Sequence, residues 1–196
     1  MRYDAEHKQK TREKVLKAAA KAIRADGPDR IAVAGVMAEA GLTHGGFYAH
    51  FASKEALVAD AIEQMFVDAD ARLHHHLDGR SPGEGLASYL AFYLSPAHRD
   101  ARGSGCPMAA LSSDLPRLSA ISRKQFAKGV KRLIDSLAEA IAANGGADAE
   151  TLARSALSEM VGALSLARIE PNSAQSAAIL GGSRELLTRR LDLAVI

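Results

Sequence analysis

The segment Gly41–Phe51, GLTHGGFYAHF, brings together hydroxyl, imidazole and phenol side chains at short spacing, with a lysine soon after it. These groups donate hydrogen bonds and the lysine adds positive charge, so they suit the phosphate oxygens and base edges of a nucleic-acid duplex. The two adjacent glycines would let the backbone come close to such a partner. The candidate contact residues are Thr43, His44, Gly45, Gly46, Tyr48, Ala49, His50 and Lys54.

Two short helices would position these groups. Hydrophobic spacing predicts one over Val33–Ala40 and another over His44–His50, joined by a turn at Gly41, which is the pattern of a helix-turn-helix. The residues expected to pack inward are Val36, Met37, Ala40, Leu42, Phe47 and Phe51. Each glycine costs a helix roughly 1 kcal/mol relative to alanine, so a close approach to DNA or to the neighbouring helix would explain the pair. Periodicity alone also fits a loop at Gly45-Gly46 with the aromatic rings as ordinary core.

A basic stripe lies on the helix predicted over Lys8–Ala25, which ends at Asp26-Gly27-Pro28. The net charge of the whole chain is only +2, but Lys8 to Arg24 contains seven basic residues and one acid, Glu13. At 3.6 residues per turn, five of them share an arc of roughly 80°, opposite an apolar stripe. The basic set is Lys10, Lys14, Lys17, Lys21 and Arg24, and the apolar set is Leu16, Ala19, Ala20 and Ile23. We expect Lys10 and Lys14 to contact DNA.

Helical periodicity dominates the rest of the chain, which predicts an all-α protein of about nine helices. Ser53 is the expected N-cap of a long helix that reaches His76, where three consecutive histidines point apart and cannot share a metal ion. Further helices are predicted at 84–94, 108–113, 119–143, 148–169 and 173–193, with loops at 78–85 and 95–105. We expect a head over residues 1–52, with the helix-turn-helix at about 31–50, and a larger body over 53–196.

Several classes of protein are excluded by what the sequence lacks. It has no apolar run of the ~18 residues that a membrane span needs and no signal peptide, so a cytoplasmic location is expected. Its single cysteine, Cys106, rules out an intrachain disulfide and a cysteine-based zinc site. The motifs of serine hydrolases, P-loop proteins and zinc proteases are missing, so we expect no enzyme, no metal and no cofactor.

Residues Lys8–Met65 resemble the DNA-binding head of TetR-family regulators. The segments that carry the resemblance are KTREKVLKAAAKAIRADG, VMAEAGLTHGGFYAHF and ASKEALVADAI. The family pattern is met at Gly41, Leu42, Thr43, Gly45, Phe47, Tyr48, His50, Phe51, Lys54, Glu55 and Leu57. The resemblance implies a base-reading helix over Thr43–Ala49. It also implies phosphate or groove contacts by Thr43, Tyr48, His50 and Lys54. Many members carry Ser/Thr and Arg where this chain has Ile31, Ala32 and Ala34, which shifts the electrostatic contribution to the first helix and to Lys54.

The resemblance further implies a homodimer that joins through the last two helices, represses from a pseudo-palindromic operator and is released by a small-molecule inducer. The residues that could line an inducer pocket are Tyr89, Phe92, Tyr93, Cys106, Met108, Leu111, Phe126, Val130 and Met160. Each of them could equally be plain core. Cys106 precedes Pro107 at a loop-to-helix junction, where a thiol can have a lowered pKa and sense oxidants or electrophiles. The alternative function is a nonspecific architectural DNA-binding protein.

Overall fold

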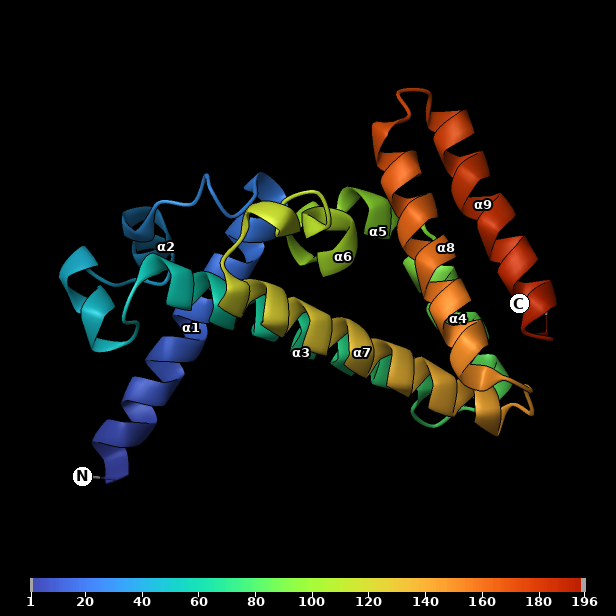
Figure 1. The fold of residues 1–196 in the computed structure, drawn as a ribbon, viewed down its shortest axis with the longest axis horizontal. Helices are drawn as coiled ribbons and strands as arrows, with labels where there is room; N and C mark the ends of the chain where they lie inside the picture. Colours follow the sequence, from blue (N-terminus) through green and yellow to red (C-terminus); the bar gives the residue numbers. More distant parts are fainter. Residues whose placement is uncertain (1, 195–196) are drawn as a thin grey trace.

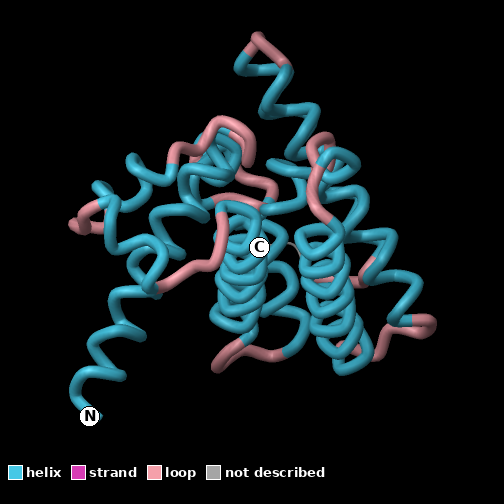
Figure 2. The backbone as a smooth tube through the Cα atoms, turned by 60° about the vertical axis from the view of Figure 1, so that its left-hand side comes forward, coloured by secondary structure: helices cyan, strands magenta, loops and turns pink. Residues whose placement is uncertain are grey.

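The computed structural model describes residues 2–194, and within them every regular element is a helix. Figure 2 shows this part of the chain as helix and loop alone. The head elements are α1 (Arg2–Asp26), α2 (Val33–Glu39) and the 3-10 helix η1 (His44–Ala49). The body elements are α3 (Lys54–Leu77), α4 (Pro82–Tyr93), α5 (Pro96–Asp100), η2 (Arg102–Ser104), α6 (Pro107–Leu111), η3 (Leu115–Arg117), α7 (Ala120–Ala143), α8 (Ala149–Ile169) and α9 (Ser173–Arg190). The all-α prediction is therefore confirmed.

The elements are arranged along one long axis (Figure 1). The head lies at one end, and the α8–α9 pair stands at the other. Between them α3 and α7 lie side by side, while α1 packs against α3, η2 and α6. The first helix therefore contacts both the head and the body. None of the described helices is long and apolar enough to cross a membrane.

Two of the loops predicted from the sequence contain helix starts. The loop predicted at 78–85 ends at Ser81, because Ser81 and Glu84 form a capping box with Pro82 at the first helical position. The loop predicted at 95–105 contains α5, where the Ser95 hydroxyl accepts a hydrogen bond from the backbone N–H of His98. Proline is tolerated at the first helical position because the N–H it lacks has no partner there. The two Ser-Pro pairs therefore start helices.

Two boundaries in the head also differ from the prediction. The first helix begins at Arg2 instead of Lys8, and the helix predicted at His44–His50 is a 3-10 helix that ends at Ala49. Ser53 caps α3 as predicted, its hydroxyl accepting from the backbone N–H of Ala56. His76, the third of the three consecutive histidines, is half-buried. Its ring stacks on Phe92 at 5.1 Å between ring centroids.

The α3–α7 crossing forms the centre of the body. Phe66 of α3 is fully buried and meets Phe126 of α7 edge to face, with ring centroids 5.0 Å apart. Gly129 lies directly against Phe66, since a Cβ added there would be 2.1 Å from Phe66 Cγ. The absence of a side chain at Gly129 is what lets these two helices approach so closely.

Candidate nucleic-acid interface

The turn of the helix-turn-helix is built on Gly41, whose φ of +75° lies in the left-handed region that favours glycine. The N–H of Leu42 donates to the carbonyl of Met37 at 2.9 Å and so closes the turn onto α2. Phe47 and Phe51 stack at 5.7 Å between ring centroids and are both buried. Phe47 and Phe51 thus face inward, as predicted, and help to hold η1 in place beside α2.

Most of the predicted contact residues form one exposed surface along η1. Thr43, His44, Gly45, Tyr48 and Ala49 are exposed, and Gly46 is partly buried. Tyr48 is 75% exposed, yet its ring meets Phe47 edge to face at 5.2 Å, so the phenol is supported while its hydroxyl remains open to a partner. A Cβ added at Gly45 would meet nothing within 4 Å, so no packing within the chain requires glycine there.

His50 lies at the edge of this surface and faces the protein more than the prediction assumed. It is half-buried, and its Nδ1 is buried without a hydrogen-bond partner among the described residues. Burial lowers the pKa of His50, and the nearby charges of Lys8 and Arg12 lower it further. The ring is therefore uncharged at neutral pH, which limits its role toward phosphate to a neutral hydrogen bond.

Lys54 has a second partner inside the head. Its Nζ donates to the backbone carbonyl of Asp29 at 3.2 Å, which joins the first turn of α3 to the segment before α2. A phosphate bound beside η1 would therefore compete with this carbonyl for Lys54 Nζ.

Arg12 is a part of the head that the sequence analysis missed. Its guanidinium lies 4.9 Å from the centre of the Phe51 ring and forms an ion pair with Asp60 of α3 at 2.5 Å. It thereby joins α1, the end of the helix-turn-helix and α3. Its place four residues before Leu16, on the apolar face of α1, was the signal that could have identified it.

The basic stripe of α1 is shorter than predicted. Lys10, Lys14, Lys17 and Lys21 are exposed, but Lys10 pairs with Glu6 at 2.9 Å and Lys21 with Glu39 at 2.8 Å. Within the described residues Lys14 and Lys17 make no ion pair, so they are the more available cations. The prediction was wrong for Arg24, which does not belong to the exposed basic stripe. Only 6% of Arg24 is exposed, and it faces the body.

The body contains an aromatic cavity bounded by α1, α3, α4, α5 and α6. Five of the predicted pocket residues line it, namely Tyr89, Phe92, Tyr93, Cys106 and Met108. The other four do not: Leu111, Phe126 and Met160 are buried elsewhere in the core, and Val130 is half-buried. The cavity volume of about 20 Å³ is room for a single water molecule in this conformation.

Cys106 does not have the exposed surroundings that a reactive thiol needs. It is buried at the start of α6, with Pro107 at the first helical position as expected. Burial raises the pKa of the thiol, and the hydrogen bonds and the Arg168 charge around it offset this only in part. The expected lowering of its pKa at the helix N-terminus is therefore outweighed by desolvation.

The comparisons with known proteins agree with this architecture. Residues 15–61, from the middle of α1 into α3, match the family described as bacterial regulatory proteins, tetR family. A search of curated proteins found no match. Three solved structures share the fold over nearly the whole chain. E. coli NemR in its reduced form is 21% identical, with a TM-score of 0.80 and coverage of 92% of this chain and 96% of that one. A TetR transcriptional regulator from Chloroflexus aurantiacus is 25% identical, with a TM-score of 0.79 and coverage of 95% and 96%. A TetR-family regulator from Agrobacterium tumefaciens is 23% identical, with a TM-score of 0.76 and coverage of 93% and 98%.

Proposed function

We propose that this chain is a regulator of the tetR family, whose model matches residues 15–61, and that it acts as a sequence-specific repressor released from its operator by a small molecule. The observation that carries the proposal is the surface of η1, where Thr43, His44 and Tyr48 are exposed above a buried Phe47–Phe51 core. A short helix held in this way can enter the major groove with its first residues toward the bases. We place this activity in the cytoplasm, where the DNA is accessible.

The affinity for the DNA backbone would come from two sources. Lys14 and Lys17 are exposed cations on α1, and Lys54 lies beside η1. Each lysine that neutralises a phosphate releases counterions, so binding should weaken steeply as salt rises. The hydroxyls of Thr43 and Tyr48 would add hydrogen bonds that fix the register on the duplex.

A homodimer that joins through α8 and α9 would supply a second DNA-binding head. The outer faces of these helices expose Leu166, Ile169 and Leu186, which are 54%, 76% and 54% accessible. Cβ atoms added at Gly162, Gly181 and Gly182 would meet nothing within 4 Å, so these glycines leave an open surface on which a second helix pair could pack closely. Two-fold symmetry would then favour a pseudo-palindromic site with half-sites spaced by ~34 Å or a multiple of it.

The decisive experiment is a footprint on the DNA that flanks the gene for this chain, repeated at random DNA of equal length. A specific repressor should protect a pseudo-palindromic site and bind it at least about a thousandfold more tightly than random DNA at moderate salt. The alternative is a nonspecific architectural protein, which would bind both DNAs alike. Equal protection of both would therefore overturn the specific proposal.

A further inference from the structure

Arg24, in the last turn of α1, lies where three hollows of the molecule meet. It lines the aromatic cavity and the larger cleft between the segment 99–110 and the end of α8. It also lines a hollow beside Lys17 and Lys21. With 6% of its surface exposed, its guanidinium has left water almost completely. A charge buried this far is costly unless it is paired.

The charge of Arg24 is only partly compensated. Nη2 donates to the carbonyl of Met65 at 3.1 Å and lies 3.4 Å from the carboxylate of Asp68. That carboxylate is about one-third exposed and also accepts from Gln64 at 2.9 Å. The Nε of Arg24 is buried and has no partner among the described residues. This donor is therefore left for a group that the protein itself does not provide.

Two more hydrogen-bond donors, Tyr93 and Arg72, line the same cavity. Tyr93 is 3% exposed, and among the described residues its hydroxyl has the Cys106 thiol, a weak acceptor, as its side-chain hydrogen-bonding neighbour, with no oxygen acceptor in reach. The guanidinium of Arg72 lies 5.2 Å from the centre of the Phe92 ring and forms no ion pair within the described part of the chain. The cavity lining contains the two guanidinium groups of Arg24 and Arg72 and one carboxylate, that of Asp68.

The walls of the cavity are aromatic and apolar. Phe92 stacks on His98 at 5.0 Å between ring centroids, and Met108 and Leu133 complete the lining. His98 is buried with its Nδ1 2.8 Å from the Tyr93 carbonyl, and burial lowers its pKa, so the ring stays neutral. The cavity lining therefore combines hydrogen-bond donors with aromatic and apolar side chains, and the Arg72 guanidinium lies over one of the rings.

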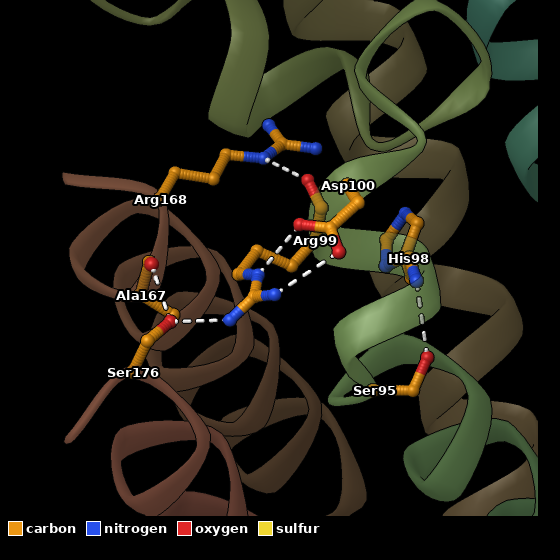
Figure 3. Close-up of polar contacts among 7 residues, drawn as sticks. All are labelled: Ser95, His98, Arg99, Asp100, Ala167, Arg168 and Ser176. Atoms are coloured by element: carbon orange, nitrogen blue, oxygen red, sulfur yellow. Dashed lines mark hydrogen bonds and ion pairs between the residues drawn. The ribbon is translucent and has the colours of Figure 1, made fainter. Parts of the chain in front are cut away.

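Arg168 lies just outside, across Gly105. Figure 3 shows it reaching from α8 to the backbone carbonyl of Arg99, which accepts from its Nε at 3.1 Å. Its Nη2 is buried and has no hydrogen-bond partner in the part of the chain that the structure describes. A Cβ at Gly105 would lie 2.9 Å from that atom and 3.3 Å from His98 Nε2. The Arg99 guanidinium, in contrast, has partners: it donates to the Asp100 carboxylate and to the Ser176 hydroxyl (Figure 3).

We infer that this cavity binds a small organic anion, namely a carboxylate carried on an aromatic or short aliphatic body. The carboxylate would accept from Arg24 Nε, Arg72 and the Tyr93 hydroxyl, and the body would lie against Phe92 and Met108. Charge-assisted hydrogen bonds to guanidinium groups favour such an acceptor over a neutral one. The assignment names the ligand class of the proposed inducer pocket, so its regulatory meaning rests on the proposed function.

Ligand entry requires the cavity to widen. The present volume of about 20 Å³ is far below that of a ligand pocket, whereas the neighbouring cleft of about 620 Å³ shares Arg24 with it. Gly105 lines the cavity and lies against Arg168, which lines the cleft. An anion drawn to Arg24 would therefore enter from the arginine-lined cleft and displace the segment around Gly105.

Isothermal titration calorimetry on the full chain without DNA tests the inference. Benzoate, phenylacetate and octanoate are each compared with the corresponding neutral amide, and we expect at least one acid to bind roughly tenfold more tightly than its amide. Arg72→Gln and Tyr93→Phe should each reduce that preference severalfold. Arg24→Gln would also remove the bond to Met65, so the first two variants decide. Arg30→Gln, an exposed arginine outside the cavity, is the matched control and should change nothing.

Three results would overturn the inference: no acid binds, acids and amides bind alike, or both Arg72→Gln and Tyr93→Phe keep the full preference. Footprints on the same samples test the proposed function separately. A chain that prefers carboxylates but protects no operator would refute only the repressor proposal. A chain that protects an operator but prefers no carboxylate would refute only the ligand class.

Discussion

Phe47 and Tyr48 are consecutive residues with opposite expected roles, and substituting each in turn tests the candidate interface. Phe47 is 2% exposed and stacks on Phe51, whereas Tyr48 is 75% exposed and touches Phe47 only through a ring edge. Phe47→Ala should therefore lose stability, while Tyr48→Phe and Tyr48→Ala should lose DNA binding.

The magnitudes follow from these surroundings. Removing a buried phenylalanine costs about 3–5 kcal/mol, a large share of the roughly 5–15 kcal/mol that stabilises an ordinary domain. Tyr48→Ala removes an exposed side chain, so the loss of stability should stay within about 0.5 kcal/mol. A hydrogen bond from the Tyr48 hydroxyl to a phosphate is worth about 1.5–3 kcal/mol. The proposed dimer makes it twice, so Tyr48→Phe should weaken operator binding about a hundredfold or more.

The assay pairs urea unfolding, followed by circular dichroism at one fixed protein concentration, with operator binding by fluorescence anisotropy at fixed salt. Tyr48→Phe is the sharper variant because it keeps the ring against Phe47 and removes only the hydroxyl. Wild-type affinity in Tyr48→Phe would show that the hydroxyl makes no DNA contact. Unfolding of Tyr48→Ala would show that the ring belongs to the core, and either result refutes the assignment of faces.

Three further predictions follow from single contacts. Gly129→Ala should destabilise the chain by about 1–3 kcal/mol despite the better helix propensity of alanine, because its Cβ would lie 2.1 Å from Phe66 Cγ. Gly35→Ala is the control, because a Cβ added at Gly35 would meet nothing within 4 Å. In urea unfolding this variant should be as stable as the wild type or more stable. Lys54→Ala should weaken binding to all DNA sequences alike and lower the salt slope by about one; an unchanged slope would mean that Lys54 serves only the Asp29 carbonyl. Because burial raises the pKa of Cys106, the folded chain should react with a disulfide reagent at neutral pH at least roughly tenfold more slowly than the urea-unfolded chain, and faster as the pH rises. Equal rates would restore the idea of a reactive sensor thiol.

The sequence was sufficient wherever local chemistry decides the structure. The Gly41 turn, the Ser53 cap and the inward positions Phe47 and Phe51 each depend on neighbours within a few residues, and the structure has all of them. The prediction failed at the two Ser-Pro pairs, which start α4 and α5, for a related reason. A serine followed by proline fits both a loop and a helix start, and the choice is made by what comes next, such as Glu84 completing the capping box after Ser81.

Five residues of the cavity lining were predicted from the sequence. The place of Arg24 in it could not be predicted, because Arg24 lies at the border between the two faces of α1. On a helical projection Arg24 falls only about 40° from Ala20, a residue of the buried stripe, and at the edge of the basic arc nearest to it. Whether such a position faces solvent depends on what covers that end of the helix, and in this fold α3, η2 and α6 pack against α1. These elements come from segments far along the chain, so no local pattern encodes their arrival. The same coverage that removes Arg24 from the basic stripe leaves its Nε buried without a partner. Tertiary packing has thus moved a cation that the sequence pattern assigned to the DNA side of α1 into the lining of the cavity where we propose an anion site.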